Sequence, residues 1–243
     1  MRKINVIAMA GSGQRFLDQN YITPKPLIII KRKPMFYYAA KSLLLSKKII
    51  FICKKQLSFI HKLKFFIKKF FKSRKIIEIR KKTNGQATTC KLASKYLRND
   101  DIVTYGSCDY FYKFNRKQFN QLINSNDLIV FVHKPMKTNI INFKDYGWVK
   151  KGKKNAIQKI QCKNKVSKNP KNDLVITGTF TFKNKKIFHH SYKNMVKEID
   201  KINNEYYMDT VAKHAILLKY KVKYILVKNF KSYGTPSELK KND

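Results

Sequence analysis

The sequence is poor in acidic residues and in glycine. It has 14 Asp and Glu against 54 Lys and Arg in 243 residues, which gives a formal net charge of +40, and it has 8 glycines. Taken alone, this charge suggests a nucleic acid or an anionic membrane as a partner. Lysine is spread along the whole chain, however, and Lys, Ile and Asn are abundant, as an AT-rich genome produces. We therefore attribute most of the charge to coding bias with some affinity for phosphate-bearing ligands, and we rank a nucleic-acid partner below that.

Patterns that define several classes of protein are absent from the sequence. The four cysteines form no C-x-x-C pair and the five histidines show no metal-ligand spacing, so we expect neither a disulfide framework nor a zinc site. No apolar run approaches the roughly 20 residues that a spanning helix needs. No signal-peptide pattern follows Met1. The sequence therefore predicts a cytoplasmic protein without a membrane span.

The length and the spacing of apolar runs predict one α/β domain over residues 1–243. In the first half, expected strands alternate with expected helices, which is typical of a Rossmann-like, three-layer α/β/α fold with a mostly parallel sheet. The expected strands are Ile4–Met9, Ile49–Cys53, Ile76–Ile79, Ile102–Tyr105 and Leu128–Val132. The expected helices are Pro34–Ser46, Gln56–Lys72 and Gln86–Leu97.

The second half of the chain changes character. Short strands separated by Lys, Asn and Gly turns come first, and two helices and a final strand follow them. These are strands Tyr146–Val149, Ala156–Gln161 and Ile176–Phe182, helices Lys185–Ile202 and Tyr207–Leu218, and strand Val222–Val227. We interpret the short strands as a small β-rich insertion that binds substrate.

The stretch Leu57–Phe71 reads as a basic amphipathic helix. Its apolar residues cover about half of a helical wheel, and opposite them stand Lys62, Lys68, Lys69 and Lys72. Such a helix is able to rest on a membrane surface. A helix that covers a sheet needs the same pattern, and we favour that interpretation.

The strongest functional signal follows the first expected strand. Gly11 and Gly13 stand at its end, where glycine permits positive φ and close approach of the backbone to a ligand. The N–H groups of Ala10, Gly11, Ser12 and Gly13 are then free to point at phosphate oxygens. Arg15 adds a fork-shaped cation. The loop is neither a Walker loop nor a dinucleotide fingerprint, because it lacks the lysine of the first and the third glycine of the second.

Lys25 lies between two prolines shortly after this loop. Pro24 and Pro26 are expected to hold the backbone around it extended and rigid, so its ammonium group has little conformational freedom left to lose. A lysine restricted in this way, close to a glycine loop, is suited to hold the phosphates of a nucleotide.

Together these segments resemble the sugar-phosphate nucleotidyltransferase family, which has the nucleotide-diphospho-sugar transferase fold. Its opening pattern is a strand, G-x-G-x-R-[FM], a variable spacer, P-K-P-L, and a helix begun by K-P-M/L. The matching segments are Ala10–Phe16, Pro24–Leu27 and Lys33–Met35. Weaker matches follow in family order at Asn84–Ala87, Gly106–Asp109, Tyr146–Val149, Lys163, Gly178–Thr179, Asn204–Tyr207 and Gly234–Pro236.

The resemblance implies a nucleotide site and a metal site. Gly85 and Gln86 stand where the family contacts the base, and Asp109 stands where it binds a metal ion, here expected to be Mg²⁺. Ser232 occupies the position where many members carry a second metal-binding Asp or Asn. We name Asp209 as the residue that takes over this metal ligand or else positions substrate.

The resemblance also implies a reaction. A nucleoside monophosphate would pass from an NTP to a phosphorylated small molecule, such as a sugar phosphate or a similar surface-polysaccharide precursor, with release of pyrophosphate. Such chemistry needs positioning and charge neutralisation, for which the catalytic candidates are Arg15, Lys25 and Asp109. Lys163 is our candidate for holding the incoming phosphate, and the other substrate-binding candidates are Gly147, Gly178 and Glu205.

Two alternatives stay open at this point. One is a cytidylyltransferase for a phosphocholine-like or phosphoamide-like acceptor. The other is a non-catalytic nucleotide-binding or RNA-binding protein that keeps the fold. The base of the NTP, the acceptor and the oligomeric state do not follow from the sequence.

Overall fold

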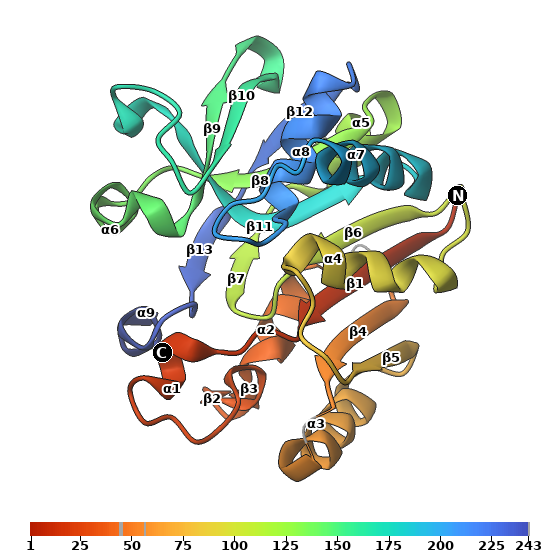
Figure 1. Cartoon of the computed structure of the whole chain (residues 1–243), viewed down its shortest axis with the longest axis vertical. Coiled ribbons are helices and arrows are strands. Elements are labelled where there is room, and N and C mark those ends of the chain that lie inside the picture. Colours follow the sequence, from red (N-terminus) through yellow and green to blue (C-terminus); the bar gives the residue numbers. More distant parts are fainter. Residues whose placement is uncertain (44–45, 56, 243) are drawn as a thin grey trace.

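The structure of the chain is a computed structural model that describes residues 1–43, 46–55 and 57–242 (Figure 1). Its centre is a 9-stranded sheet. The parallel part of this sheet has the order β6-β1-β4-β5 and contains β1 (Lys3–Met9), β4 (Ile49–Lys54), β5 (Arg74–Ile79) and β6 (Ile102–Gly106). The predicted α/β class and the parallel strands of the first half are therefore confirmed.

The second half of the chain extends this sheet mainly with antiparallel strands. The long strand β11 (Leu174–Phe182) runs antiparallel to β6, to β8 (Leu128–His133) and to β9 (Gly147–Lys151). Gly178 of β11 has φ of 82°, and the pairing with β8 shifts register around it. The remaining strands are β10 (Ile157–Cys162), antiparallel to β9, and β12 (Val222–Leu226), parallel to β8.

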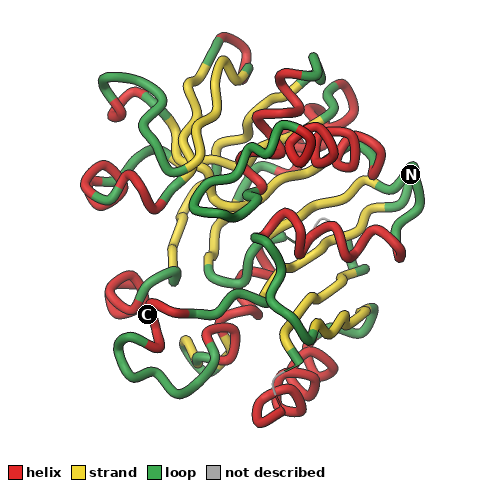
Figure 2. Tube along the Cα trace, viewed as in Figure 1, coloured by secondary structure: helices red, strands yellow, loops and turns green. Residues whose placement is uncertain are grey.

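Helices cover both faces of the sheet and make three layers (Figure 2). In β1, Val6 packs toward one face and Ile7 toward the other, so the strand is apolar on both sides, as parallel strands usually are. One face carries α4 (Gln86–Lys91), α7 (Lys185–Lys197) and α8 (Met208–Leu217). The other carries α2 (Met35–Ser42), α3 (Leu57–Phe70) and α5 (Arg116–Ser125).

The helix at Leu57–Phe71 covers the sheet, as we favoured. Ile60, Leu63 and Ile67 of α3 are buried against β1, β4 and α2. Lys62, Lys68 and Lys69 lie on the outer side. Within the described part of the chain, no helix combines the length and the apolar character that crossing a membrane requires.

Several element boundaries differ from the predicted ones. Helix α7 ends at Lys197 and not at Ile202, because the backbone turns left-handed at Ile199 with φ of 49°. The predicted helix Gln86–Leu97 is α4 followed by a 3-10 stretch over Leu92–Tyr96. Pro34 is extended and caps α2, which begins at Met35. The predicted end of that helix at Ser46 is wrong, because α2 ends at Ser42 and Leu43 caps it. Residues 44–45 of that predicted helix, and the predicted start of the next helix at Gln56, lie outside the described residues.

Short elements were missed by the sequence prediction. Helix α5 is amphipathic, with Phe119 and Ile123 buried and Asn115 capping its first turn, so its signal was present. The others are α1 (Gln14–Leu17), β2 (Ile29–Ile30), β3 (Lys33–Pro34), β7 (Tyr110–Lys113), α6 (Lys137–Ile141), β13 (Lys228–Ser232) and α9 (Pro236–Asn242). The pairing of β7 with β13 joins segments far apart in the sequence, which no local pattern announces.

A buried ion pair ties the starts of β1 and β6 together. Asp101 is fully buried and accepts hydrogen bonds from Arg2 Nε at 2.7 Å, from Arg2 Nη2 at 2.6 Å and from the Arg98 backbone N–H at 2.7 Å. Burial alone would raise the pKa of Asp101, but these bonds to Arg2 and Arg98 hold it below its ordinary value of 3.8.

Replacing Asp101 by Asn should lower the free energy of unfolding by about 2–3 kcal/mol at pH 7, because the Arg2 guanidinium loses its partner. In the wild-type chain the ionised carboxylate stabilises the fold above its ordinary pKa, and this contribution is lost as pH falls through the lower pKa of the folded state. Urea unfolding at pH 7 and in acid measures both effects. Asp100→Asn, an exposed neighbour with the same charge change, is the control, and an equal loss there would contradict the assignment.

Candidate active site

The glycine loop lies at the carboxyl end of β1 and leads into the short helix α1. Gly13 caps α1 with φ of 72° and ψ of 24°, a left-handed conformation that favours glycine. At Gly11, nothing lies within 4 Å of the position that a Cβ atom would take. The backbone of the loop therefore borders open space, as a ligand cradle requires.

This loop forms one wall of a cavity of about 250 Å³. The opposite walls come from the start of α4, from the end of β6 and from the segment before α8. The predicted nucleotide residues Ala10, Gly11, Gly13, Gly85 and Gln86 all line this cavity, together with Lys25, Asp109 and Glu205. Ser12, the residue between the two glycines of the loop, is exposed and does not line this cavity.

Gly85 is needed where the start of α4 meets the segment before α8. It has φ of 104°, and a Cβ atom on it would lie 2.5 Å from the Tyr206 carbonyl oxygen. Two backbone hydrogen bonds close this contact. The Ala87 N–H donates to the Tyr206 carbonyl oxygen at 3.0 Å, and the Tyr206 N–H donates to the Asn84 carbonyl oxygen at 2.9 Å. This clamp holds Gln86 and Glu205 at the same cavity.

Lys25 and Asp109 form an ion pair at the inner end of the cavity. Lys25 Nζ lies 2.5 Å from Asp109 Oδ2 and donates to the Gly234 carbonyl oxygen at 3.1 Å. The other oxygen of Asp109 accepts a hydrogen bond from the Ser107 hydroxyl. Asp109 follows the carboxyl end of β6, where open α/β sheets place their ligands.

The two charges of this pair keep each other ionised. Burial opposes the charge on both groups, but Asp109 raises the pKa of Lys25 and Lys25 lowers the pKa of Asp109. The backbone is extended at Pro24 and then forms a 3-10 turn over Lys25–Leu27. The prediction of an extended backbone at Lys25 itself was therefore wrong. The turn closes through a bond from the Leu27 N–H to the Pro24 oxygen at 2.8 Å.

A second cavity of about 320 Å³ lies on the other side of the ion pair. The two cavities share five lining residues, which are Lys25, Gln86, Ser107, Asp109 and Tyr207. The second cavity also receives Arg15, Gly147, Gly178 and Asp209 from the predicted set. Lys25 and Asp109 therefore stand at the junction of two adjoining spaces.

Asp209 lies beside Gly147 in the second cavity, and Lys163 is near enough to act on its charge. A side chain at position 147 would collide with the Asp209 carboxylate, so glycine is required there. Burial raises the pKa of Asp209 to about 6, although Cys162 and Lys163 act in the opposite direction. Lys163 has its Nζ 4.9 Å from the centre of the Tyr207 ring. Asp209 and Lys163 are thus close to each other, and their role in binding substrate stays a prediction.

Arg15 lies at the rim of the second cavity. Its Nη2 atom is 2.6 Å from Asp145 Oδ1, and half of its side chain is exposed. Arg15 does not line the first cavity in the described part of the chain. The structure therefore places its guanidinium toward the second cavity and beside Asp145.

Two residues near the C-terminus complete the junction. The Cβ position of Gly234 would be 3.3 Å from Ser232 Oγ and 3.6 Å from Asp109 Oδ2, which places both oxygens around the same point. The Tyr233 backbone N–H bonds the Asp109 carbonyl oxygen at 2.7 Å. The sequence pattern had aligned Ser232 with a metal ligand, but it gave no sign that Gly234 supplies a carbonyl to Lys25.

A family model described as nucleotidyl transferase matches residues 4–224 of the chain. The chain belongs to this family. The match includes the glycine loop, the Lys25–Asp109 pair and Asp209, and it ends before Ser232 and Gly234. A search of curated proteins found no match.

Solved structures of several nucleotidyltransferases share the fold of this family member. A nucleoside-diphosphate-sugar pyrophosphorylase from Vibrio cholerae RC9 has a TM-score of 0.80 at 20% identity, with 98% of both chains covered. An inositol-1-phosphate CTP transferase from T. maritima has a TM-score of 0.74 at 15% identity, covering 98% of this chain and 91% of that one. A UTP-bound UGPase from Acinetobacter baumannii has a TM-score of 0.73 at 17% identity, covering 100% and 92%.

The residues at the junction suit a magnesium ion that arrives with its substrate. Among the described residues, no three His, Cys, Asp or Glu side chains are grouped as a closed metal cage. Mg²⁺ is usually held by one or two carboxylates together with substrate phosphates and water. Asp109 provides one carboxylate at the junction, with the neutral Ser232 oxygen beside it, and Asp209 provides a second in the adjoining cavity.

Asp209→Asn should stabilise the fold at pH 8 by about 2 kcal/mol, because it removes a carboxylate whose ionisation is opposed by burial. In the wild-type chain, ionisation of Asp209 lowers the free energy of unfolding as pH rises from the ordinary carboxyl range through about 6. The stabilisation of the Asn variant relative to wild type should therefore vanish near pH 4. Thermal melts across this pH range measure the effect, and activity should fall in the same variant.

The matched control is Asp200→Asn. Asp200 bonds Lys213 at 2.7 Å and His214 at 2.9 Å, and these groups hold its pKa below the usual value against the effect of burial. Its loss should therefore destabilise the fold. A destabilised Asp209→Asn would mark Asp209 as a structural carboxylate and not as a ligand of substrate or metal.

Proposed function

We propose that the protein transfers the nucleoside monophosphate of an NTP to the phosphate of a small acceptor and releases pyrophosphate. The observation that carries this proposal is the Lys25–Asp109 pair at the junction of two cavities. One cavity has the glycine loop and Gln86 for the nucleotide. The other has Arg15, Asp209 and nearby Lys163 for the acceptor.

In the proposed reaction, an oxygen of the acceptor phosphate attacks the α-phosphorus of the NTP. The new O–P bond forms as the bond to the β-phosphate oxygen breaks, and pyrophosphate leaves with the electron pair. Both reactants are anions, so the protein contributes by positioning and by neutralising charge. Backbone N–H groups of Gly11 and Gly13 and the ammonium of Lys25 serve the triphosphate. Arg15 and Lys163 serve the incoming phosphate.

When bound, Mg²⁺ would supply further positive charge at the transferring phosphate. Asp109 would hold it, with Asp209 or the Ser232 hydroxyl as a further ligand. Ser107 fixes the Asp109 carboxylate through its hydroxyl hydrogen bond. The chemistry needs no protein nucleophile, and Cys108 is unsuited to be one, because burial raises the pKa of its thiol to about 12.

A sugar phosphate or a similar precursor of a surface polysaccharide is the acceptor class we propose. The fold is shared with proteins named as sugar-nucleotide pyrophosphorylases, and the acceptor cavity of about 320 Å³ has room for a small phosphorylated molecule. Its lining offers hydrogen-bonding groups on Tyr146, Thr177 and Glu238.

Asp109→Asn should reduce pyrophosphate release by roughly 100-fold or more, because it removes the carboxylate that would hold Mg²⁺ and that pairs with Lys25. The assay follows pyrophosphate from each of the four NTPs with a panel of phosphorylated acceptors. Asp100→Asn, with the same charge change on the exposed surface, should keep full activity. If no NTP yields pyrophosphate with any acceptor, or if Asp109→Asn is fully active, the family fold here serves binding alone.

An acceptor that carries an ammonium group besides its phosphate, such as a phosphocholine-like molecule used by a cytidylyltransferase, is a second candidate. The acceptor cavity is favourable to positive charge in a chain that is otherwise strongly basic. Among the described residues that line this cavity, carboxylates outnumber cations. The two cations are Arg15 and Lys25, and each already faces a carboxylate. Rings of Tyr146, Tyr207 and Phe230 stand beside Glu238 and Asp209, an environment that suits an ammonium group.

Glu238→Gln tests this acceptor class. Glu238 accepts from the Tyr146 hydroxyl at 2.9 Å and from the Thr235 N–H at 3.1 Å, and Gln keeps the latter bond at the start of α9. If the acceptor carries an ammonium group, its KM should rise about tenfold in the variant, while the KM of a hexose 1-phosphate, which has no cationic group, stays unchanged. An equal change for both acceptors would remove this candidate.

A further inference from the structure

The outer face of α3 carries a phenylalanine among positive charges. Phe65 is 59% exposed and lies on the side opposite the buried Ile60, Leu63 and Ile67. In a helix, its neighbours one turn away are at positions three and four residues before and after it. These neighbours are His61, Lys62, Lys68 and Lys69, all exposed. The sheet-covering role of α3 explains its inner face and leaves Phe65 unexplained.

Exposed aliphatic residues lie at the same end of the molecule. Ile22 is 86% exposed and Leu17 is 50% exposed, both in the segment between the glycine loop and Lys25, and Ile29 of β2 is 49% exposed. The turn between β2 and β3 adds the exposed cations Lys31 and Arg32. Figure 1 shows α3, the β2–β3 hairpin and the loop after α1 together at the lower end.

Contacts on the inner and lateral sides of α3 hold these three segments side by side. Leu17, Ile22, Phe59 and Leu63 line one apolar hollow of about 100 Å³ between the loop and α3. On the hairpin side, Lys33 Nζ lies 5.9 Å from the centre of the Phe70 ring of α3. We call this surface the apolar-basic end, and it consists of Leu17, Ile22, Ile29, Lys31, Arg32, Lys62, Phe65, Lys68 and Lys69.

The charge around the apolar-basic end has one sign. Residues 19–99 include 22 Lys and Arg and one acidic residue, Glu78. Glu78 is already paired with Lys64 at 2.7 Å. The proposed reaction uses few of these cations. Among the described ones, Lys25 and Lys82 line the first cavity. The partner of this end must therefore be anionic and must also accept apolar side chains.

We propose that the apolar-basic end binds the surface of an anionic lipid bilayer. Each lysine close to such a surface contributes attraction to the headgroups, and exposed Phe and Ile side chains gain by entering the boundary between headgroups and acyl chains. Nucleic acid would satisfy the lysines and stack on Phe65, but it offers no apolar environment to Ile22, Leu17 and Ile29. The bilayer satisfies both kinds of side chain. This binding is independent of the proposed transfer reaction.

Sedimentation of the full chain with lipid vesicles tests the proposal. The protein should bind vesicles of phosphatidylcholine and phosphatidylglycerol in a roughly 7:3 ratio, and should not bind phosphatidylcholine alone or the anionic vesicles at high salt. Phe65→Ser should weaken partitioning roughly tenfold, and Ile22→Ser should weaken it by a similar factor. Lys68→Gln with Lys69→Gln should weaken it about fivefold for each lysine removed.

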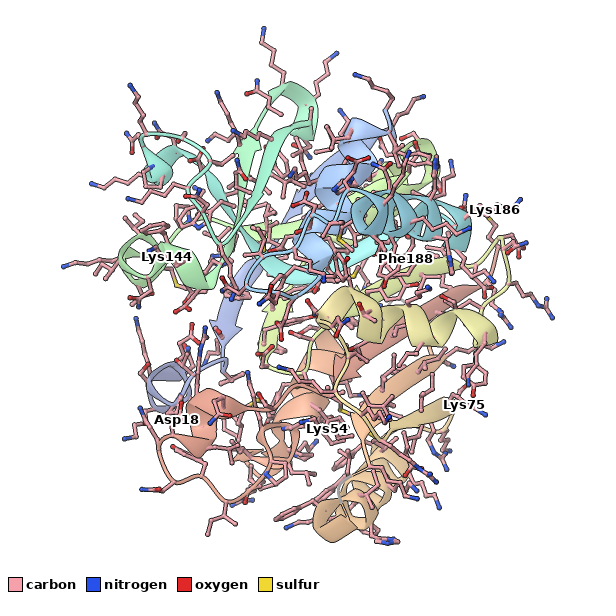
Figure 3. The ribbon with its side chains drawn as sticks, viewed as in Figure 1. Asp18, Lys54, Lys75, Lys144, Lys186 and Phe188 are labelled. Atoms are coloured by element: carbon pink, nitrogen blue, oxygen red, sulfur yellow. The ribbon has the colours of Figure 1, made fainter. Side chains whose placement is uncertain are left out.

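Matched variants at the other end of the molecule separate this surface from the general charge of the chain. Lys186 points outward from α7, far from Lys54, which lines the hollow between the loop and α3 (Figure 3). Lys186→Gln with Lys193→Gln removes the same charge from exposed positions of α7. Ile199→Ser removes a side chain that is 70% exposed. These control variants should keep vesicle binding, and Phe65→Ser should keep nucleotidyl transfer.

The proposal is overturned if the chain does not bind anionic vesicles, or if the control variants weaken binding as much as those at the apolar-basic end. It is also overturned if a homopolymeric RNA binds more tightly than the vesicles with the same dependence on Phe65, since the surface would then belong to nucleic acid. If the wild-type chain shows no nucleotidyl transfer, that result counts against the proposed function and leaves the vesicle result unaffected.

Discussion

The ion pair between Lys25 and Asp109 is the interaction on which the site depends. It joins the segment after the glycine loop to the end of β6, 84 positions away, and the same ammonium group bonds the carbonyl of Gly234, 209 positions away. Three distant stretches of chain thus meet at one nitrogen atom. Removing either partner would leave a partly buried charge unpaired, which is costly. The pair therefore fixes how the two cavities that share it lie relative to each other.

Acidic residues are concentrated at this site in a chain that has few of them. Among described residues, five of the 14 Asp and Glu line the two cavities, against three of the 54 Lys and Arg. Asp109 faces Lys25, Asp145 faces Arg15, and Glu205 faces Lys82 at 3.4 Å. The site is thus nearly neutral inside a protein of charge +40, and the general attraction for anions does not extend into it unchanged.

Local patterns predicted the parts of the site that lie on continuous segments. The glycine loop and Asp109 each follow an apolar run that predicted a strand, and Lys25 stands out between two prolines. The family resemblance assigned all three to one site. Contacts between distant segments had no such signal. The clamp of Gly85 on Tyr206, the fit of Gly147 against Asp209 and the pairing of β7 with β13 depend on tertiary packing. The direction of the Arg15 side chain likewise depends on Asp145, 130 positions away.

The closed ion pair also bears on which anions the site accepts. A free phosphate that drew Lys25 to itself would leave Asp109 buried without a counter-charge, and this cost offsets much of the gain. Under the proposed function, a triphosphate that carries a divalent cation would bring partners for both groups, a cation for the carboxylate and a phosphate for the ammonium. No charge would then be left unpaired. The internal pair would thus favour a metal-bound nucleotide over a free phosphate.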